Sequence, residues 1–211
     1  MRDDKTSRDK RGYHHGNLRE ALIEAALKLI NEHGSDGVTL SEAARLAGVS
    51  AAAPYRHFKD RNSLMTAVAE QGFVTFAEVL EKARAATPGN PVKSLMAIGE
   101  AYLDFARRAP AHYAAMFEAG IAHSSTPDLA RESARAFNVL RDAAADIHAI
   151  LPPERRAPAL MIALHIWSLT HGVASLFLRG DNARRNLPVK PEELLESGVL
   201  VYLDGLGYAP R

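Results

Sequence analysis

The residue types that most often carry catalysis or hold metals form no recognised pattern in this chain. Nine histidines are present and no cysteine, which excludes disulfides, zinc–thiolate sites and thiol nucleophiles. His14 and His15 stand in a charged N-terminal stretch, and His165 and His171 fall on different faces of one predicted helix. No HExxH motif, glycine-rich phosphate loop or nucleophile elbow occurs. We therefore expect no enzymatic activity, no metal and no cofactor.

Residues 39–59 have instead the features of a unit that binds nucleic acid. Thr39 begins a capping box, in which its hydroxyl accepts the N–H of Glu42 and the Glu42 side chain reaches back. A short helix follows, Gly48 allows a tight turn, and a second helix is predicted over Ser50–Phe58. Two short helices packed through small alanines form a helix-turn-helix. Its second helix can enter the major groove of DNA.

The segment Val38–Phe58, VTLSEAARLAGVSAAAPYRHF, resembles the DNA-binding domain of the TetR (tetracycline-repressor-like) transcriptional regulators. The shared pattern is a Val-Thr start, a central Ala-Gly-Val-Ser and a closing Tyr-x-His-Phe, and the similarity extends over about residues 17–76. Gly12–Leu18 and Trp167–Gly172 resemble a subgroup with a Trp…His-Gly signature in its C-terminal domain. The resemblance implies a cytoplasmic, ligand-responsive regulator, usually a repressor, that binds a pseudo-palindromic operator in double-stranded DNA as a homodimer.

This resemblance also implies roles for individual residues. Thr39, at a helix start, is expected to hold a phosphate, and Tyr55 and Lys59 to contact phosphates as their family counterparts do. Arg61 stands where the family usually has lysine and is expected to serve the same purpose. An arginine in the second helix can pair with guanine, whereas alanines can only meet thymine methyl groups or allow close approach. The residues left to face bases or backbone are Ser50, Ala51, Ala52, Ala53, Arg56 and His57.

Pro54 departs from the family pattern, which usually has a buried leucine or isoleucine at this position. Because proline lacks an N–H, we expect the second helix to bend or to start late. Sequence reading then depends on Arg56, on DNA shape, or on a flexible basic arm at residues 1–15, for which a solvated tail is the alternative. Pro54 and the alanine run are also the only support for a rival function, a helical ligand-binding module that no longer binds DNA.

Helical periodicity and turn signals predict an all-α fold of about nine helices. Residues 16–76 form the predicted three-helix DNA-binding domain, and residues 77–211 form a larger C-terminal regulatory and dimerisation domain. A long helix predicted from Arg61 to about Ala86 joins the two domains, and the second domain contains further long helices predicted over about 92–107, 127–151, 154–179 and 191–203.

Two apolar helices, at about 154–179 and 191–203, are the candidates for a homodimer interface, because paired across a two-fold axis they give a four-helix bundle. The alternative is that both are buried within one subunit. The stretch 159–178 also has the length of a membrane span. It contains His165 and His171, which are costly in lipid, so we interpret it as a helix buried in protein and expect no membrane partner.

Aromatic and methionine side chains of the second domain predict a pocket for a small, largely apolar effector. Trp167 and His171 lie one helical turn apart and share a face, so they are the preferred pair for orienting a ligand. The alternative is that these side chains form the core. The candidates for the pocket are Phe105, Met116, Phe117, Phe137, Trp167 and His171.

Overall fold

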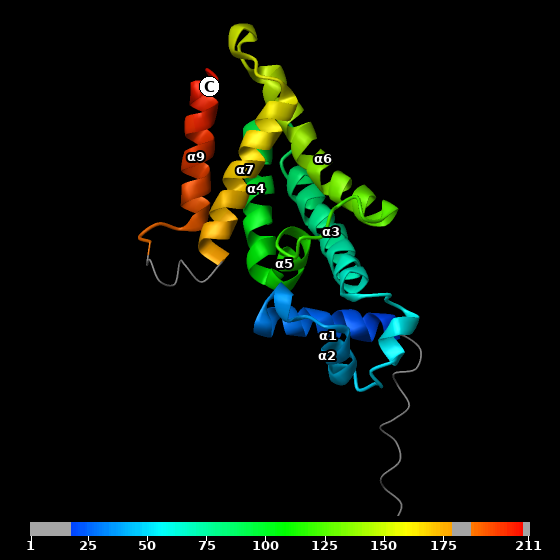
Figure 1. The fold of residues 1–211 in the computed structure, drawn as a ribbon. Coiled ribbons are helices and arrows are strands. Elements are labelled where there is room, and N and C mark those ends of the chain that lie inside the picture. The colour runs from blue at the N-terminus through cyan, green and yellow to red at the C-terminus, as the bar shows by residue number, and fades with distance from the viewer. Residues whose placement is uncertain (1–17, 179–186, 209–211) are drawn as a thin grey trace, which may run out of the picture.

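The computed structural model of the chain describes residues 18–178 and 187–208. Within these ranges the protein is all-helical, as predicted, with eight α-helices and three short 3-10 segments (Figure 1). One of the nine predicted helices, that over residues 50–58, is replaced by a 3-10 turn. The arm at residues 1–15 and the Gly12–Asn17 part of the subgroup motif lie outside the described residues.

The elements follow one another closely along the chain. In order they are α1 Leu18–His33, η1 Ser35–Gly37, α2 Leu40–Leu46, η2 Ala53–Arg56, α3 Arg61–Ala85, α4 Pro91–Arg108, α5 Pro110–Phe117, α6 Pro127–Ile150, η3 Pro153–Arg155, α7 Ala159–Leu178 and α9 Pro191–Gly205. The 154–179 helix was predicted too long, since α7 begins only at Ala159 and a 3-10 turn precedes it.

Several helix starts are fixed by local chemistry. Four helices, α4, α5, α6 and α9, begin on proline, whose missing N–H costs nothing at the first helical position. The side chain of Asn90 accepts the N–H of Lys93 at 2.9 Å before α4. The hydroxyl of Thr126 accepts the N–H of Leu129 at 3.1 Å before α6. These caps satisfy backbone donors that have no partner inside the helix.

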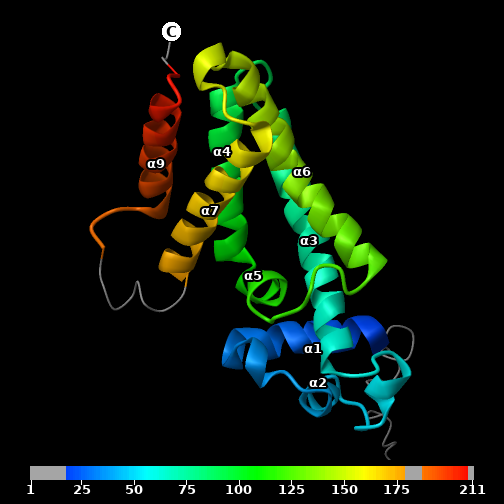
Figure 2. The same ribbon diagram turned by 45° about the horizontal axis from the view of Figure 1, so that its top comes forward.

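The helices form a head and a body (Figures 1 and 2). In both views α1, α2 and η2 lie together at one end, and α3 runs from them into the body. In the body α3 packs against α4, α5 and α6, α6 packs against α7, and α9 packs on the outer side of α7. The predicted domain boundary at residue 76 falls inside α3, so one continuous helix belongs to both parts.

Glycine occupies several of the close approaches between helices, among them those at Gly72 and Gly198. A Cβ built on Gly72 of α3 would lie 2.7 Å from the Met116 sulfur of α5, and one built on Gly198 of α9 would lie 2.9 Å from a Leu169 methyl carbon of α7. Real Cβ atoms essentially never come so close to another heavy atom, so a larger residue at either position would require the facing Met116 or Leu169 side chain to shift. The α3–α5 contact therefore has little room for a side chain at position 72.

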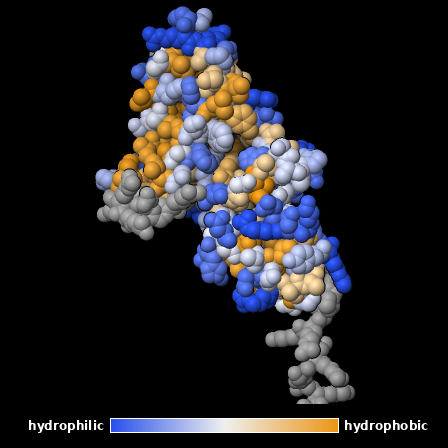
Figure 3. Space-filling model, viewed as in Figure 1, coloured by the Kyte–Doolittle hydropathy of each residue, from blue (hydrophilic) through white to orange (hydrophobic). Residues whose placement is uncertain are grey.

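Helix α7 is the one described helix whose length and composition would allow it to cross a membrane, over Ala159–Phe177, and a third of that window is buried. It packs against α4, α6 and α9. Its remaining face is exposed together with that of α9, and hydrophobic side chains gather on the part of the body that these two helices occupy (Figure 3). The large exposed apolar residues of the two helices are Leu160, Met161, Leu176, Leu200 and Val201.

Candidate DNA-binding head and ligand cavity

The start of α2 is capped as predicted, but only in one direction. The Thr39 hydroxyl accepts the N–H of Glu42 at 3.1 Å. The expected return bond from the Glu42 side chain is wrong, because that carboxylate accepts instead from Nε and Nη2 of Arg45, at 2.9 and 2.8 Å. An exposed arginine one turn along the same helix is the stronger competitor for the carboxylate, since that bond is charge-assisted.

The turn after α2 needs Gly48, whose φ of 71° lies in the left-handed region. The N–H of Gly48 donates to the Arg45 carbonyl and that of Val49 donates to the Ala44 carbonyl, at 3.2 and 3.0 Å. Both bonds satisfy carbonyls at the end of α2. The chain then leaves the helix in a direction that brings the next segment, residues 50–58, to the surface of the head (Figure 2).

This next segment is shorter than predicted and of a different helical type. In an α-helix residue 54 would donate to the Ser50 carbonyl, but Pro54 has no N–H. The Ser50 carbonyl accepts instead from Ala53, at 3.0 Å, which is the tighter 3-10 spacing. Only Ala53–Arg56 is helical, so the expected late start is observed, and the expected helix over 50–58 is wrong.

The same proline helps to fix the segment on the head. Pro54 and Phe58 are buried, as is Val38 just before α2, and the guanidinium carbon of Arg19 lies 5.7 Å from the centre of the Phe58 ring. Buried anchors at both ends of the turn leave the side chains between them pointing outward. Tyr55, between the anchors, is 60% exposed.

Most of the predicted DNA-contacting residues lie on the surface of the head. Ala53 and Arg61 are half-buried. The others are exposed, and these are Thr39, Ser50, Ala51, Ala52, Tyr55, Arg56, His57 and Lys59. Their contacts with DNA remain predictions, but their side chains are accessible to a ligand as large as a duplex.

Arg61 has a structural function in addition to the phosphate contact predicted for it. Its Nη2 donates to the Ser35 carbonyl at 2.6 Å and its Nε donates to the Val38 carbonyl at 3.1 Å. The side chain thus ties the first turn of α3 to the connection between α1 and α2. Asp60 fixes the same turn: its carboxylate accepts the Ser63 N–H at 2.8 Å, and this bond is the main reason that the pKa of Asp60 is lowered.

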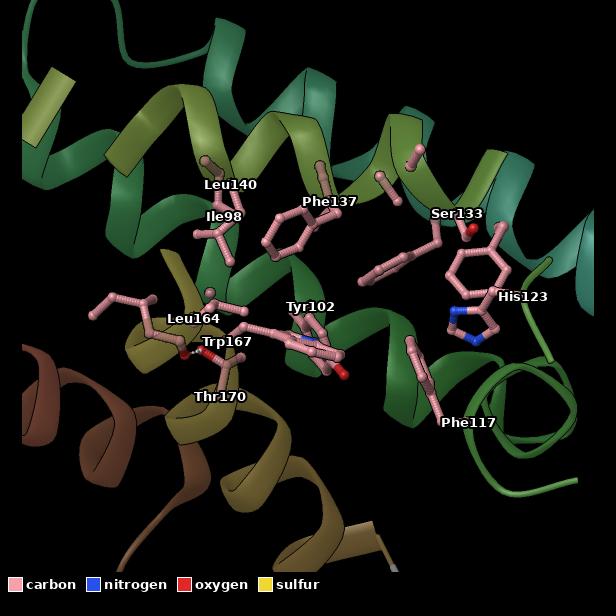
Figure 4. Close-up of a pocket in the computed structure, with 17 residues that line it drawn as sticks. Ile98, Tyr102, Phe117, His123, Ser133, Phe137, Leu140, Leu164, Trp167 and Thr170 are labelled. Atoms are coloured by element: carbon pink, nitrogen blue, oxygen red, sulfur yellow. Dashed lines mark hydrogen bonds between the residues drawn. The ribbon is translucent and has the colours of Figure 1, made fainter. Parts of the chain in front are cut away.

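A cavity of about 350 Å³ lies in the body between α3, α4, α6 and α7 (Figure 4). Its wall contains no Asp, Glu, Lys or Arg among the described residues. Aromatic side chains contribute much of the lining, and these are Phe73, Phe76, Tyr102, Phe117, Phe137 and Trp167. The volume is at the lower end of the range for small-molecule sites, about 300–1,000 Å³.

Three of the six predicted pocket residues line this cavity, namely Phe117, Phe137 and Trp167. Phe105 is instead buried behind Phe76, with ring centres 4.9 Å apart, and Met116 packs on α3 beside Gly72. Both residues are part of the core, which was the alternative to a pocket for these aromatic and methionine side chains. Sequence reasoning did not include Phe73, Phe76 or Tyr102. Phe73 and Phe76 lie three residues apart on α3 and so share a face. This spacing could have indicated from the sequence that the two residues belong to the pocket.

His171 lies outside the cavity lining, in a part-buried polar cluster next to it. The Tyr102 and Tyr113 hydroxyls lie 2.7 and 3.1 Å from its Nδ1. Tyr102 and Trp167 both line the cavity, so Tyr102 belongs to the lining and to this cluster. Burial, followed by the nearby Tyr113, raises the pKa of Tyr102 and keeps it neutral. Trp167 thus faces the cavity, and its ring centre lies 6.0 Å from that of His171.

Two family descriptions match this chain. Bacterial regulatory proteins of the tetR family match residues 22–68, and the tetracyclin repressor-like C-terminal domain matches residues 95–202, about half of the chain. The chain belongs to the TetR family. Its head is the part that the first match covers, and the cavity lies largely within the second. The Trp…His-Gly subgroup remains a prediction.

Individual relatives agree with the family assignment. The regulator BetI of Cronobacter sakazakii is 30% identical over 163 residues, which cover 75% of this chain and 74% of BetI. The regulator AcrR of Shigella flexneri is 32% identical over 80 residues, so the match spans only 37% of its length. A solved structure from Rhodococcus sp. RHA1, of a protein with unknown function, has a TM-score of 0.77 and 28% identity, and covers 94% of this chain and all of the other.

Proposed function

We propose that this TetR-family chain is a DNA-binding transcriptional regulator, a cytoplasmic repressor that a small, largely apolar effector releases from its operator. The observation that carries the proposal is the segment between Pro54 and Phe58. Its two buried ends hold Tyr55, Arg56 and His57 outward on the surface of the head. A short rigid support with exposed aromatic and basic side chains is suited to docking on a DNA backbone and groove.

The proposed homodimer forms through α7 and α9. Val201 is 71% exposed on α9, and Leu200 beside it is exposed as well, which is costly for apolar side chains in a monomer. Pairing of the two helices with their copies across a two-fold axis would cover this face in a four-helix bundle. Two heads related by the same axis would bind a pseudo-palindromic operator with half-sites about one DNA turn apart.

The proposed effector site is the cavity of the body. Phe73 and Phe76 line it from α3, the helix that continues to Arg61 at the head. An effector that favours one position of these two rings therefore also favours one position of the head. The effector changes the affinity of the protein for DNA only by as much as its own affinity differs between the two positions of the head.

Selection of binding sites from random DNA with the purified full chain tests the proposal. We expect enrichment of a palindromic sequence, and an affinity that falls steeply as salt rises because phosphate contacts release counterions. Failure to enrich any site at low salt would refute the DNA-binding function and would favour a helical ligand-binding module.

A further inference from the structure

Three polar side chains that line the cavity, those of Thr170, Ser133 and His123, have their hydrogen atoms bonded to backbone carbonyls. The Thr170 hydroxyl donates to the Ile166 carbonyl at 2.8 Å, and the Ser133 hydroxyl donates to the Ala130 carbonyl at 3.2 Å. Each hydroxyl oxygen keeps lone pairs that can accept a further bond. Both residues line the cavity.

His123, at the exposed end of the cavity, also has its ring hydrogen bonded to a backbone carbonyl. Its Nε2 lies 3.0 Å from the Met116 carbonyl. A carbonyl oxygen can only accept, so Nε2 carries the hydrogen and, in the neutral ring, Nδ1 is an acceptor. In Figure 4 His123 and Ser133 lie at one end of the labelled group, and Ile98, Leu140 and Leu164 lie at the other.

The remaining donors near the cavity belong to the polar cluster next to it. Tyr102 lines the cavity together with Trp167, and its hydroxyl lies 2.7 Å from Nδ1 of His171. Thr170, Ser133 and His123 each have their hydrogen bonded to a backbone carbonyl and present an acceptor atom that remains available. Thr170, which is only 3% exposed, is the acceptor deepest in the protein.

We propose that the cavity selects neutral, mostly apolar molecules that carry a hydrogen-bond donor, such as phenols and alcohols; this inference rests on the effector site proposed above. A ligand O–H gains a bond to Thr170 or Ser133 without breaking one. An ether or ketone gains a bond only if a protein hydroxyl first gives up its own partner, so it gains little. A carboxylate meets no cation in the wall, and its desolvation is not compensated.

Trp167 makes the test direct, because it is the single tryptophan of the chain and it lines the cavity. Binding of 4-butylphenol, its methyl ether 4-butylanisole and 4-butylbenzoate is measured by tryptophan fluorescence and by calorimetry at neutral pH. These probes share one apolar body and differ in one group. We expect the phenol to bind about three- to ten-fold more tightly than the ether, the value of one hydrogen bond, and the benzoate to bind weakest.

Two variants assign the acceptor. Thr170→Val keeps the side-chain shape and removes the deep oxygen, so the preference for the phenol should disappear while ether binding stays. Thr66→Val is the matched control, because Thr66 is also buried but does not line the cavity, and it should keep the preference. If only Ser133→Ala removes the preference, the proposal holds with the acceptor at the exposed end.

Two results would overturn the proposal, and they differ in what they leave standing. Equal binding of phenol and ether, or tighter binding of the ether, refutes donor selection but keeps the cavity as an effector site. Absence of binding by all three probes refutes the effector site itself, and donor selection with it.

Discussion

Replacement of Arg61 separates a structural function from a DNA contact. In Arg61→Ala the carbonyls of Ser35 and Val38 lose charge-assisted hydrogen bonds of 2.6 and 3.1 Å. Such bonds contribute about 1.5–3 kcal/mol each when buried. The Arg61 side chain is 31% exposed, so water can replace part of the interaction. We therefore expect the free energy of unfolding to fall by about 2 kcal/mol, which corresponds to roughly 4–8 °C in Tm for a chain of this size.

Arg61→Lys provides the control, because it keeps the charge but not the fork that reaches two carbonyls. If Arg61 acts structurally, the lysine variant should keep one of the two hydrogen bonds, so its free energy of unfolding should fall by about 1 kcal/mol. Thermal unfolding followed by circular dichroism and operator affinity at low temperature are measured for both variants. An unchanged Tm in Arg61→Ala, together with an equal loss of affinity for all DNA sequences, would refute the structural assignment and support the phosphate contact.

Other predictions concern the head and the dimer. Pro54→Leu restores a backbone N–H, so the turn should lengthen into an α-helix, seen as a new amide protected from hydrogen exchange; an unprotected amide would show that proline is not what limits the helix. If Ala51 and Ala52 meet thymine methyl groups, uracil in place of thymine in the half-site should weaken binding about two- to four-fold per methyl, close to the value of one buried carbon; equal affinity would exclude such contacts. Leu200→Glu with Val201→Glu should give monomers in sedimentation experiments, because each charge would be buried unpaired in the bundle; a dimer in this variant would place the interface elsewhere.

Local chemistry made most of the fold predictable from the sequence. The caps at Thr39 and Asp60 and the prolines that open α4 and α6 depend on neighbours within a few residues, so residue type and spacing suffice. The late start of the turn at Pro54 was predictable for the same reason, because it depends on one missing N–H.

The interactions that the sequence did not reveal are those with competing partners or distant ones. Glu42 could bond its own helix start or Arg45, and only the folded geometry decides between them. Arg61 reaches carbonyls more than 20 positions earlier in the chain. The cavity is lined by residues of five helices, so the separation of Phe117 in the lining from Phe105 in the core depends on helix packing that periodicity does not define.

The close approach at Gly72 offers a point about which α3 can pivot. Eleven residues separate Gly72 from Arg61, a distance of about 17 Å along a helix. If α5 holds α3 at Gly72, a tilt of about 10° moves the Arg61 end by roughly 3 Å, and two such heads in a dimer separate by about 6 Å, close to two base-pair steps of DNA. A change of a few degrees beside the cavity is then enough to mismatch both half-sites at once. In that arrangement the position of Gly72 along α3 would set the ratio between motion at the cavity and motion at the DNA.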